Sequence, residues 1–183
     1  MKAPRSISLL VVWRLAELEA KHLGATQLEP AHFLIGLAKA VDVDWIEVVD
    51  KEDEDREAVV EELLREMRKL REELEGAGLN PKRLRRRLRK AIGLGQPKKE
   101  VTRLRRSKEA RLGFNGAEKL AELAGTPVYP RHLLRAVGAA ADARLLGLLH
   151  AAGMDVTCLA KAGAAADGPG IGPSLAGEEP ELN

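Results

Sequence analysis

Four histidines and one cysteine are the side chains of this 183-residue chain best suited to nucleophilic or metal chemistry. His32 and His132 each lie two residues after a proline, Pro30 and Pro130, and a repeated pair of imidazoles suits general base catalysis or metal binding. Neither histidine has a Cys, an Asp or a second His at ligand spacing nearby. The pattern therefore favours a structural role, in which each proline opens a helix and each histidine locks its N-terminus.

The remaining candidates for catalysis are isolated in the sequence. Cys158 follows Thr157 near the start of the last predicted helix, where the helix dipole can lower a thiol pKa, but no base is paired with it by spacing. His22 and His32 fall on different predicted helices. No Gly-x-x-x-x-Gly-Lys-Ser/Thr loop is present to cradle nucleotide phosphates. We expect no catalytic residue, no metal ligand and no cofactor, and hence no enzyme.

The basic side chains between residues 82 and 111 offer a different chemistry. In this stretch fourteen cations face only Glu100 and Glu109, while acidic residues dominate 42–75, although the formal net charge is only +2. The cations are Lys82, Arg83, Arg85, Arg86, Arg87, Arg89, Lys90, Lys98, Lys99, Arg103, Arg105, Arg106, Lys108 and Arg111. One hypothesis is that they make salt-dependent phosphate contacts with nucleic acid, without interleaved aromatics for base stacking. The favoured interpretation is that helix 81–92 lies against the acidic helix 56–75 with the remaining cations solvated, and a third is that the basic helix docks on an acidic partner.

A duplication organises the elements that must position these side chains. Pro30, His32 and Leu34 recur 100 residues later as Pro130, His132 and Leu134. A second similarity, between 78–80 and 153–155, has an offset of 75 residues. The unit therefore occurs twice, and its first copy carries a 25-residue insertion.

Periodicity predicts an all-α fold. Apolar residues at helical spacing, with capping residues, prolines and glycines at the ends, predict these helices: 6–23, 30–40, 56–75, 81–92, 107–124, 130–140, 142–152 and 155–162, with a short segment at 45–49. No stretch alternates as a strand does. In helix 56–75, Leu63, Met67, Leu70 and Leu74 form a stripe that packs on the domain or on a partner. If exposed, the stripe favours a homodimer.

Composition sets the remaining bounds. Aromatics make up 3% of the chain, so the core must consist mainly of aliphatic residues. A single cysteine allows no intramolecular disulfide, which fits a reducing cytoplasm. No apolar run of about 18 residues is present, so we expect no membrane span. From Gly163 onward, Gly, Ala, Pro and acidic residues predict a flexible tail.

Taken together, these motifs resemble the Clp N-terminal domain, the double-repeat helical module of the Clp/Hsp100 AAA+ unfoldases. The resemblance covers roughly 5–40, 76–92 and 105–162. The matching residues are Leu23, Gly24, Leu28, Pro30, His32, Leu34 and Leu37 in the first repeat, and Leu123, Val128, Pro130, His132, Leu133, Leu134, Gly153, Met154, Asp155 and Leu159 in the second. It implies two pseudo-symmetric bundles of about four helices that dock substrates or adaptors without catalysis.

The chain also departs from that family. The ATPase is absent, and the 25-residue insertion and the basic linker are unusual. In the ClpC-like branch an acidic residue before the repeat histidine helps bind phosphorylated arginine. Here Ala31 and Arg131 hold those positions, which argues against phosphoarginine recognition by that route.

The sequence thus predicts a first Clp repeat at 1–95 with an inserted helix at 50–75, a basic linker at 96–106, a second repeat at 107–162 and a flexible tail at 163–183. It predicts a cytoplasmic, non-catalytic interaction module, an accessory or substrate-adaptor factor of a Clp-type protease or chaperone. Its partners are a Clp-family ATPase, its protease or substrate proteins. The expected partner-binding residues are Leu63, Met67, Leu70, Leu74, Arg83, Arg86, Arg87 and Lys90. The alternative is a helical nucleic-acid-binding protein acting through 82–111.

Overall fold

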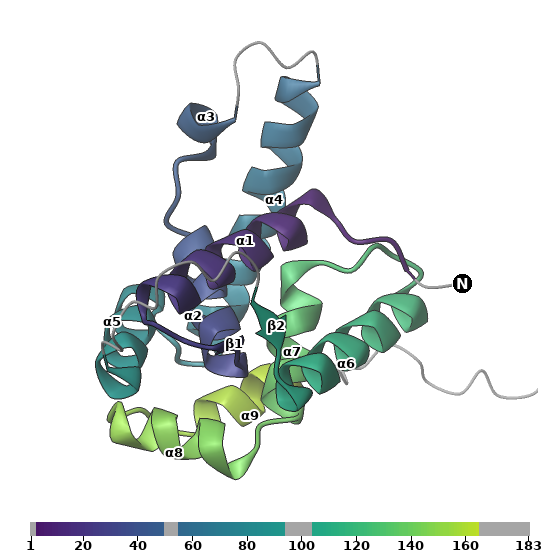
Figure 1. The fold of residues 1–183 in the computed structure, drawn as a ribbon. Coiled ribbons are helices and arrows are strands. Elements are labelled where there is room, and N and C mark those ends of the chain that lie inside the picture. Colours follow the sequence, from purple (N-terminus) through teal and green to yellow (C-terminus); the bar gives the residue numbers. More distant parts are fainter. Residues whose placement is uncertain (1–2, 50–54, 94–103, 165–183) are drawn as a thin grey trace, which may run out of the picture.

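A computed structural model describes residues 3–49, 55–93 and 104–164. Most of the predicted basic linker (96–103) and nearly all of the predicted tail (165–183) lie outside the described residues. The first repeat contains α1 (Ile7–His22), α2 (Pro30–Ala40), α3 (Trp45–Val48), α4 (Arg56–Gly76) and α5 (Pro81–Ile92). The second contains α6 (Lys108–Ala124), α7 (Pro130–Ala139), α8 (Ala143–Ala151) and α9 (Thr157–Ala164). The predicted all-α fold is confirmed (Figure 1).

Equivalent helices begin and end with equivalent chemistry in the two repeats. Ser6 and Ser107 cap α1 and α6, each accepting a hydrogen bond at 3.1 Å from a backbone N–H in the first turn. Gly24 and Gly125 follow the same two helices with positive φ, where a side chain would be strained. These local signals explain why the predicted helix boundaries lie within about two residues of the observed ones.

Short parallel strands interlock the two repeats. β1 (Gln27–Leu28) pairs with β2 (Arg105–Arg106), and the Ser107 N–H donates to the Leu28 carbonyl at 2.9 Å. At the equivalent place in the other repeat, the backbone of Arg5 forms a parallel β-bridge with that of Val128, and the Ser6 N–H donates to the Val128 carbonyl at 3.2 Å. The prediction of no strands was wrong here, because a two-residue ladder is too short to show any periodicity. In each repeat, therefore, the backbone pairs with the segment that precedes the first helix of the other repeat.

Three of the five aromatic residues meet at the seam between the repeats. Phe114 lies edge-on to both Trp13 and Phe33, with ring centroids 4.9 Å apart in each pair. The Arg5 guanidinium lies 5.6 Å above the Trp13 ring, and the Arg106 guanidinium lies 4.9 Å above the Phe114 ring. Edge-to-face and cation–π contacts each stabilise such a cluster modestly beyond its buried area. The seam thus has the same pseudo-symmetry as the chain.

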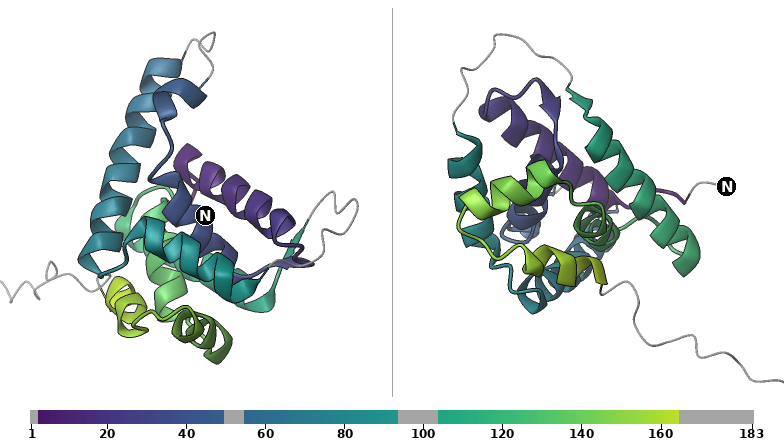
Figure 2. Two further views of the ribbon diagram at one scale, coloured as in Figure 1. Left: turned by 90° about the vertical axis from the view of Figure 1, so that its left-hand side faces the viewer. Right: turned by 90° about the horizontal axis from the view of Figure 1, so that it is seen from below.

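The insertion forms α3 and lengthens α4. Figures 1 and 2 show that α3 and the first turns of α4 stand clear of the other helices. Further along α4, Glu73 makes a bidentate ion pair with Arg135 of α7, at 2.6 and 3.1 Å. The buried Glu66 carboxylate lies 3.8 Å from Arg131 of α7. Two carboxylates of the acidic helix therefore pair with α7, while the basic helix 81–92 packs mainly against α2 and α8. The prediction that 81–92 lies against 56–75 was wrong.

Small residues set the close approach of the first two helices in each repeat. A Cβ at Gly36 of α2 would lie 2.9 Å from the Val12 carbonyl oxygen and 3.1 Å from the Ala16 Cβ of α1. In the second repeat the glycine is on the other helix, and a Cβ at Gly116 of α6 would lie 3.0 Å from the Ala136 Cβ of α7. Positions 16 and 116, and 36 and 136, are 100 residues apart. The two repeats therefore share the same helix–helix contact, but the glycine is on the second helix of the pair in the first repeat and on the first helix of the pair in the second repeat.

This exchange predicts different responses to the same substitution. Gly36→Ala should lower the free energy of unfolding by about 1–3 kcal/mol, because the new Cβ meets a backbone oxygen that cannot turn away. Adding Ala16→Gly should not restore it. Gly116→Ala, by contrast, should regain wild-type stability within about 1 kcal/mol when Ala136→Gly removes the opposing Cβ. Urea unfolding of the four variants tests this, and equal rescue in both repeats would contradict it.

Candidate functional site

The two repeat histidines lie in the first turns of α2 and α7, and each caps the N-terminus of its own helix. The backbone N–H of Glu29 donates to His32 Nδ1 at 3.0 Å, and that of Tyr129 donates to His132 Nδ1 at 3.2 Å. Burial lowers the pKa of each imidazole to about 4, helped by Arg144 at His32 and by Arg131 and Arg135 at His132. Both rings are therefore neutral at pH 7, and each carries its remaining proton on Nε2. The hydrogen bonds correspond to the predicted role as helix locks.

The four apolar residues expected to bind a partner are core residues. Leu63, Met67, Leu70 and Leu74 are all buried in the monomer. The stripe on α4 faces the bundle formed by the other helices, so it cannot meet a partner without unfolding. The expectation that these residues form a docking surface was wrong, and the stripe gives no ground for a homodimer.

The basic residues of α5 divide into anchored and exposed groups. Leu84 and Leu88 are fully buried, which turns Lys82, Arg83, Arg86 and Lys90 toward solvent. Asn80 caps the helix by accepting from the Arg83 N–H at 3.0 Å. Within the described parts of the chain, these four exposed cations have no carboxylate partner. We call Lys82, Arg83, Arg86 and Lys90 the basic face.

Other arginines of α5 hold the helix in place. Arg89 pairs with the buried Glu19 of α1, at 2.8 Å from its Nε and 2.5 Å from a terminal nitrogen. Burial raises the pKa of Glu19, but hydrogen bonds from Arg89 and Lys39 outweigh it and hold the pKa below the ordinary value. Arg87 donates to the Gly153 carbonyl at 2.6 Å, after the end of α8. Arg87 is thus partly engaged, whereas Arg83, Arg86 and Lys90 are available.

Residues of the basic face line two surface pockets. One, of about 790 Å³, is lined by Asn80 and by cations of α5 from Lys82 to Arg89. The other, of about 610 Å³, lies between Arg86, Arg87 and Lys90 and the chain at 151–153. Positive charge with no compensating carboxylate attracts an anionic surface and speeds association with it.

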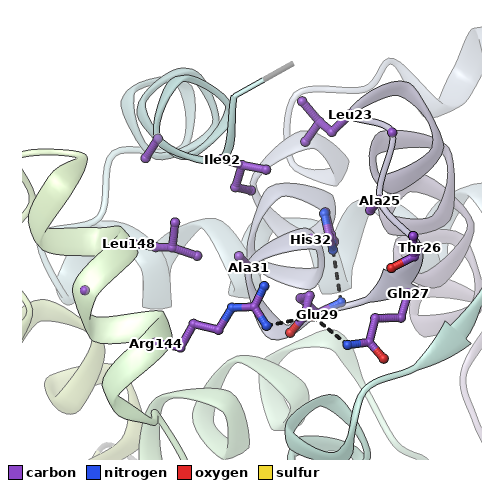
Figure 3. Close-up of a pocket in the computed structure, with 13 residues that line it drawn as sticks. Leu23, Ala25, Thr26, Gln27, Glu29, Ala31, His32, Ile92, Arg144 and Leu148 are labelled. Atoms are coloured by element: carbon purple, nitrogen blue, oxygen red, sulfur yellow. Dashed lines mark hydrogen bonds and ion pairs between the residues drawn. The ribbon is translucent and has the colours of Figure 1, made fainter. Parts of the chain in front are cut away.

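A separate cavity of about 550 Å³ lies between the repeats (Figure 3). Its walls come from the connection after α1, the start of α2, the end of α5 and α8. Arg144 of α8 forms an ion pair with Glu29 at 3.2 Å across its mouth. Sequence analysis did not identify this cavity, because its walls come from four segments widely separated in the chain.

The described part of the chain contains no group of three or more His, Cys, Asp or Glu side chains that could hold a metal ion. Cys158 is half-buried and has no disulfide partner. Within the same ranges, no helix is both long enough and apolar enough to cross a bilayer.

Comparisons with known proteins concern the fold. No family model matches the sequence, and no curated protein sequence matches it. Among solved structures, the chain is similar to the Hsp104 N-terminal domain from Candida albicans, with a TM-score of 0.54 and 17% sequence identity. The match covers 87% of this chain and 89% of that one. The chain therefore has the duplicated all-α fold of a Clp/Hsp100 N-terminal domain, as the repeat motifs predict, with a long inserted helix in its first repeat.

Proposed function

We propose that this chain is a non-catalytic docking module that serves a Clp-type ATP-dependent protease or chaperone as an accessory or substrate-adaptor factor. The fold supports the class of function, since it resembles the N-terminal domain of an Hsp104 along nearly its whole length. The observation that carries the proposal is the basic face of α5, where exposed cations lack carboxylate partners in the described residues. A rigid helix with this charge is suited to an acidic surface on a protein partner.

The architecture supports presentation of this face as a rigid surface. Arg89 fixes α5 to Glu19 of α1, and Arg87 fixes it to the end of α8 in the other repeat. We propose that the repeats at 1–95 and 107–162 act as one unit for this reason. Rigid presentation reduces the entropy lost when a partner binds.

Nucleic acid is the second candidate partner, and the same cations favour it. Phosphate contacts by Lys82, Arg83, Arg86 and Lys90 would give sequence-independent binding that weakens steeply with salt. No aromatic side chain lies on α5 for base stacking. A protein partner is therefore the better-supported proposal.

Charge reversal on α5 separates these functions from effects on the fold. The triple variant Arg83→Glu, Arg86→Glu, Lys90→Glu should lose at least tenfold in affinity for the partner while keeping its helical circular dichroism. The matched control is Arg68→Glu, Lys119→Glu, Lys161→Glu, with the same change in net charge on exposed residues outside 82–111. It should bind as the wild type does.

The binding experiment is affinity capture from native extract at low and moderate salt, read by mass spectrometry and by a nucleic-acid stain. Capture of a Clp ATPase or its peptidase at both salts, lost only in the α5 variant, supports docking. Nucleic acid captured at low salt alone, without any Clp component, favours the second candidate. Equal capture by both triple variants would contradict the role of the basic face.

A further inference from the structure

The insertion in the first repeat forms an arm that projects from the molecule. We call residues 44–49 and 55–64, which contain α3 and the first turns of α4, the acidic arm (Figures 1 and 2). Trp45 fixes its base, because its side chain is buried and its Nε1–H donates to the Ala40 carbonyl at 3.2 Å. Arg56 joins its two helices by donating to the Ile46 carbonyl at 2.6 Å. The acidic arm is therefore a defined element of the fold.

The acidic arm presents uncompensated negative charge beside exposed apolar side chains. In the parts of the chain that the structure describes, Glu47, Glu57 and Glu61 are exposed and have no cationic partner. Ile46 is 53% exposed and Val48 is 62% exposed. Apolar side chains gathered among charged ones are the usual make-up of a surface that binds another protein.

The basic face of α5 has the complementary chemistry. Its four cations lack carboxylate partners among the described residues, as the glutamates of the acidic arm lack cations. Next to Arg86 and Lys90, the small apolar residues Ala91 and Ala151 line the same pocket. One surface is thus negative with aliphatic side chains, and the other is positive with apolar ground beside it. Such a match in charge favours association and fixes its register.

These two surfaces cannot meet within one molecule. The helix α4 begins in the acidic arm and ends at Gly76, four residues before α5 begins at Pro81. Its 21 residues span about 30 Å, and Figure 1 shows the arm at one end of this helix and α5 beyond the other end. Their attraction can therefore be satisfied only between molecules.

We propose that the acidic arm of one copy of this chain docks on the basic face of a second copy. The glutamates of the arm pair with the cations of α5, and Ile46 and Val48 cover the alanines beside them. A two-fold pair satisfies both surfaces at once, because each copy gives its arm and receives the arm of the other. The contact covers the cations that are proposed to bind an acidic partner, so self-association and partner docking compete. It goes beyond the docking function and does not depend on it.

Sedimentation equilibrium over a range of protein concentrations tests the contact. The wild-type chain should dimerise at low salt and dissociate as the salt concentration rises, because exposed charges are screened. The arm variant Glu47→Lys, Glu57→Lys, Glu61→Lys should associate at least tenfold more weakly with an unchanged circular dichroism spectrum, and so should the α5 triple variant. Ile46→Ser with Val48→Ser, which keeps every charge, should weaken association severalfold. The control triple variant outside 82–111 should associate as the wild type does.

A spin label locates the contact on the second copy. Ala58→Cys places a nitroxide on the exposed start of α4, in a background in which Cys158→Ser removes the native thiol. The labelled protein is mixed with an equal amount of isotope-enriched wild type, so that only broadening between molecules is detected. The amide signals of Arg83 and Arg86 should broaden. The same label at exposed Asn115→Cys of α6 is the matched control and should leave these signals sharp.

Three results would overturn the self-contact. They are a wild-type chain that stays monomeric at every concentration, association that survives unchanged in the arm variant, and equal broadening of α5 by both labels. Loss of partner capture in the arm variant, with a monomeric wild type, would likewise overturn it and make the acidic arm a docking surface for another protein.

This inference and the proposed function fail separately. The arm variant should capture at least as much partner as the wild type, because it leaves the basic face uncovered. Normal capture by a monomeric wild type overturns the self-contact and leaves the docking function standing. Self-association that needs both surfaces, together with equal capture by the α5 triple variant and its control, supports the self-contact and removes the docking role of the basic face.

Discussion

Acidification from pH 6.5 to pH 4 should lower the free energy of unfolding by on the order of 3 kcal/mol for each of His32 and His132. The pKa of each falls from 6.5 to about 4 on folding, chiefly because burial disfavours the imidazolium. Between these values the unfolded chain binds protons that the folded chain does not. The stabilisation is therefore complete above pH 6.5 and is lost as the pH falls toward 4.

Urea unfolding at a series of pH values measures this loss. His32→Asn and His132→Asn keep an acceptor for the backbone N–H but do not titrate, so each should remove about half of the slope between pH 6.5 and 4. Glu19, whose pKa is also lowered, adds its own loss only below its ordinary value of 4.5. If the free energy of unfolding still falls as steeply between pH 6.5 and 4 in the double variant, groups other than the two histidines are responsible for the pH dependence.

Leu63→Ala should destabilise the protein by about 2–5 kcal/mol, whereas Leu64→Ala should change stability by about 0.5 kcal/mol or less. The two leucines are neighbours on α4, but Leu63 is 1% exposed and Leu64 is 39% exposed. Truncating Leu63 leaves a cavity between α4 and the rest of the bundle, and truncating Leu64 removes mainly hydrated surface.

Chemical unfolding of both variants, with partner capture measured in parallel, distinguishes a core residue from a docking residue. The core position predicts that Leu63→Ala lowers the unfolding midpoint and, at temperatures where it stays folded, still captures the partner. A stable Leu63→Ala protein that no longer binds would contradict the core assignment.

The helices could be predicted because their signals are local. Pro30 and Pro130 mark helix starts, Gly24 and Gly125 mark ends, and the spacing of Leu63, Met67, Leu70 and Leu74 marks one face. The same spacing does not say what covers that face. The pairing of Glu73 with Arg135 joins residues 62 positions apart, and the sequence around each residue contains no pattern that predicts the pair. For this reason the acidic helix was assigned to the wrong neighbour.

The seam and the cavity needed the same long-range information. Arg5-Ser6 and Arg106-Ser107 are a repeated pair at an offset of 101, with Trp13 and Phe114 following at the same offset, and this signal was available in the sequence. It marks the two segments that exchange between repeats. No comparable signal existed for the cavity, since Glu29 and Arg144 come from non-equivalent positions of the two repeats.

The exchanged segments also set an order of events during synthesis. The Ser6 N–H finds its acceptor at Val128, 122 residues later, so the first residues of the chain stay open until the second repeat has left the ribosome. At about 5–20 residues per second this wait is on the order of 10 s. Such distant closure slows folding compared with a bundle held by neighbouring helices alone. The chain is thus expected to complete its fold only once its second repeat has been synthesised, in one late step that joins its beginning to its second half.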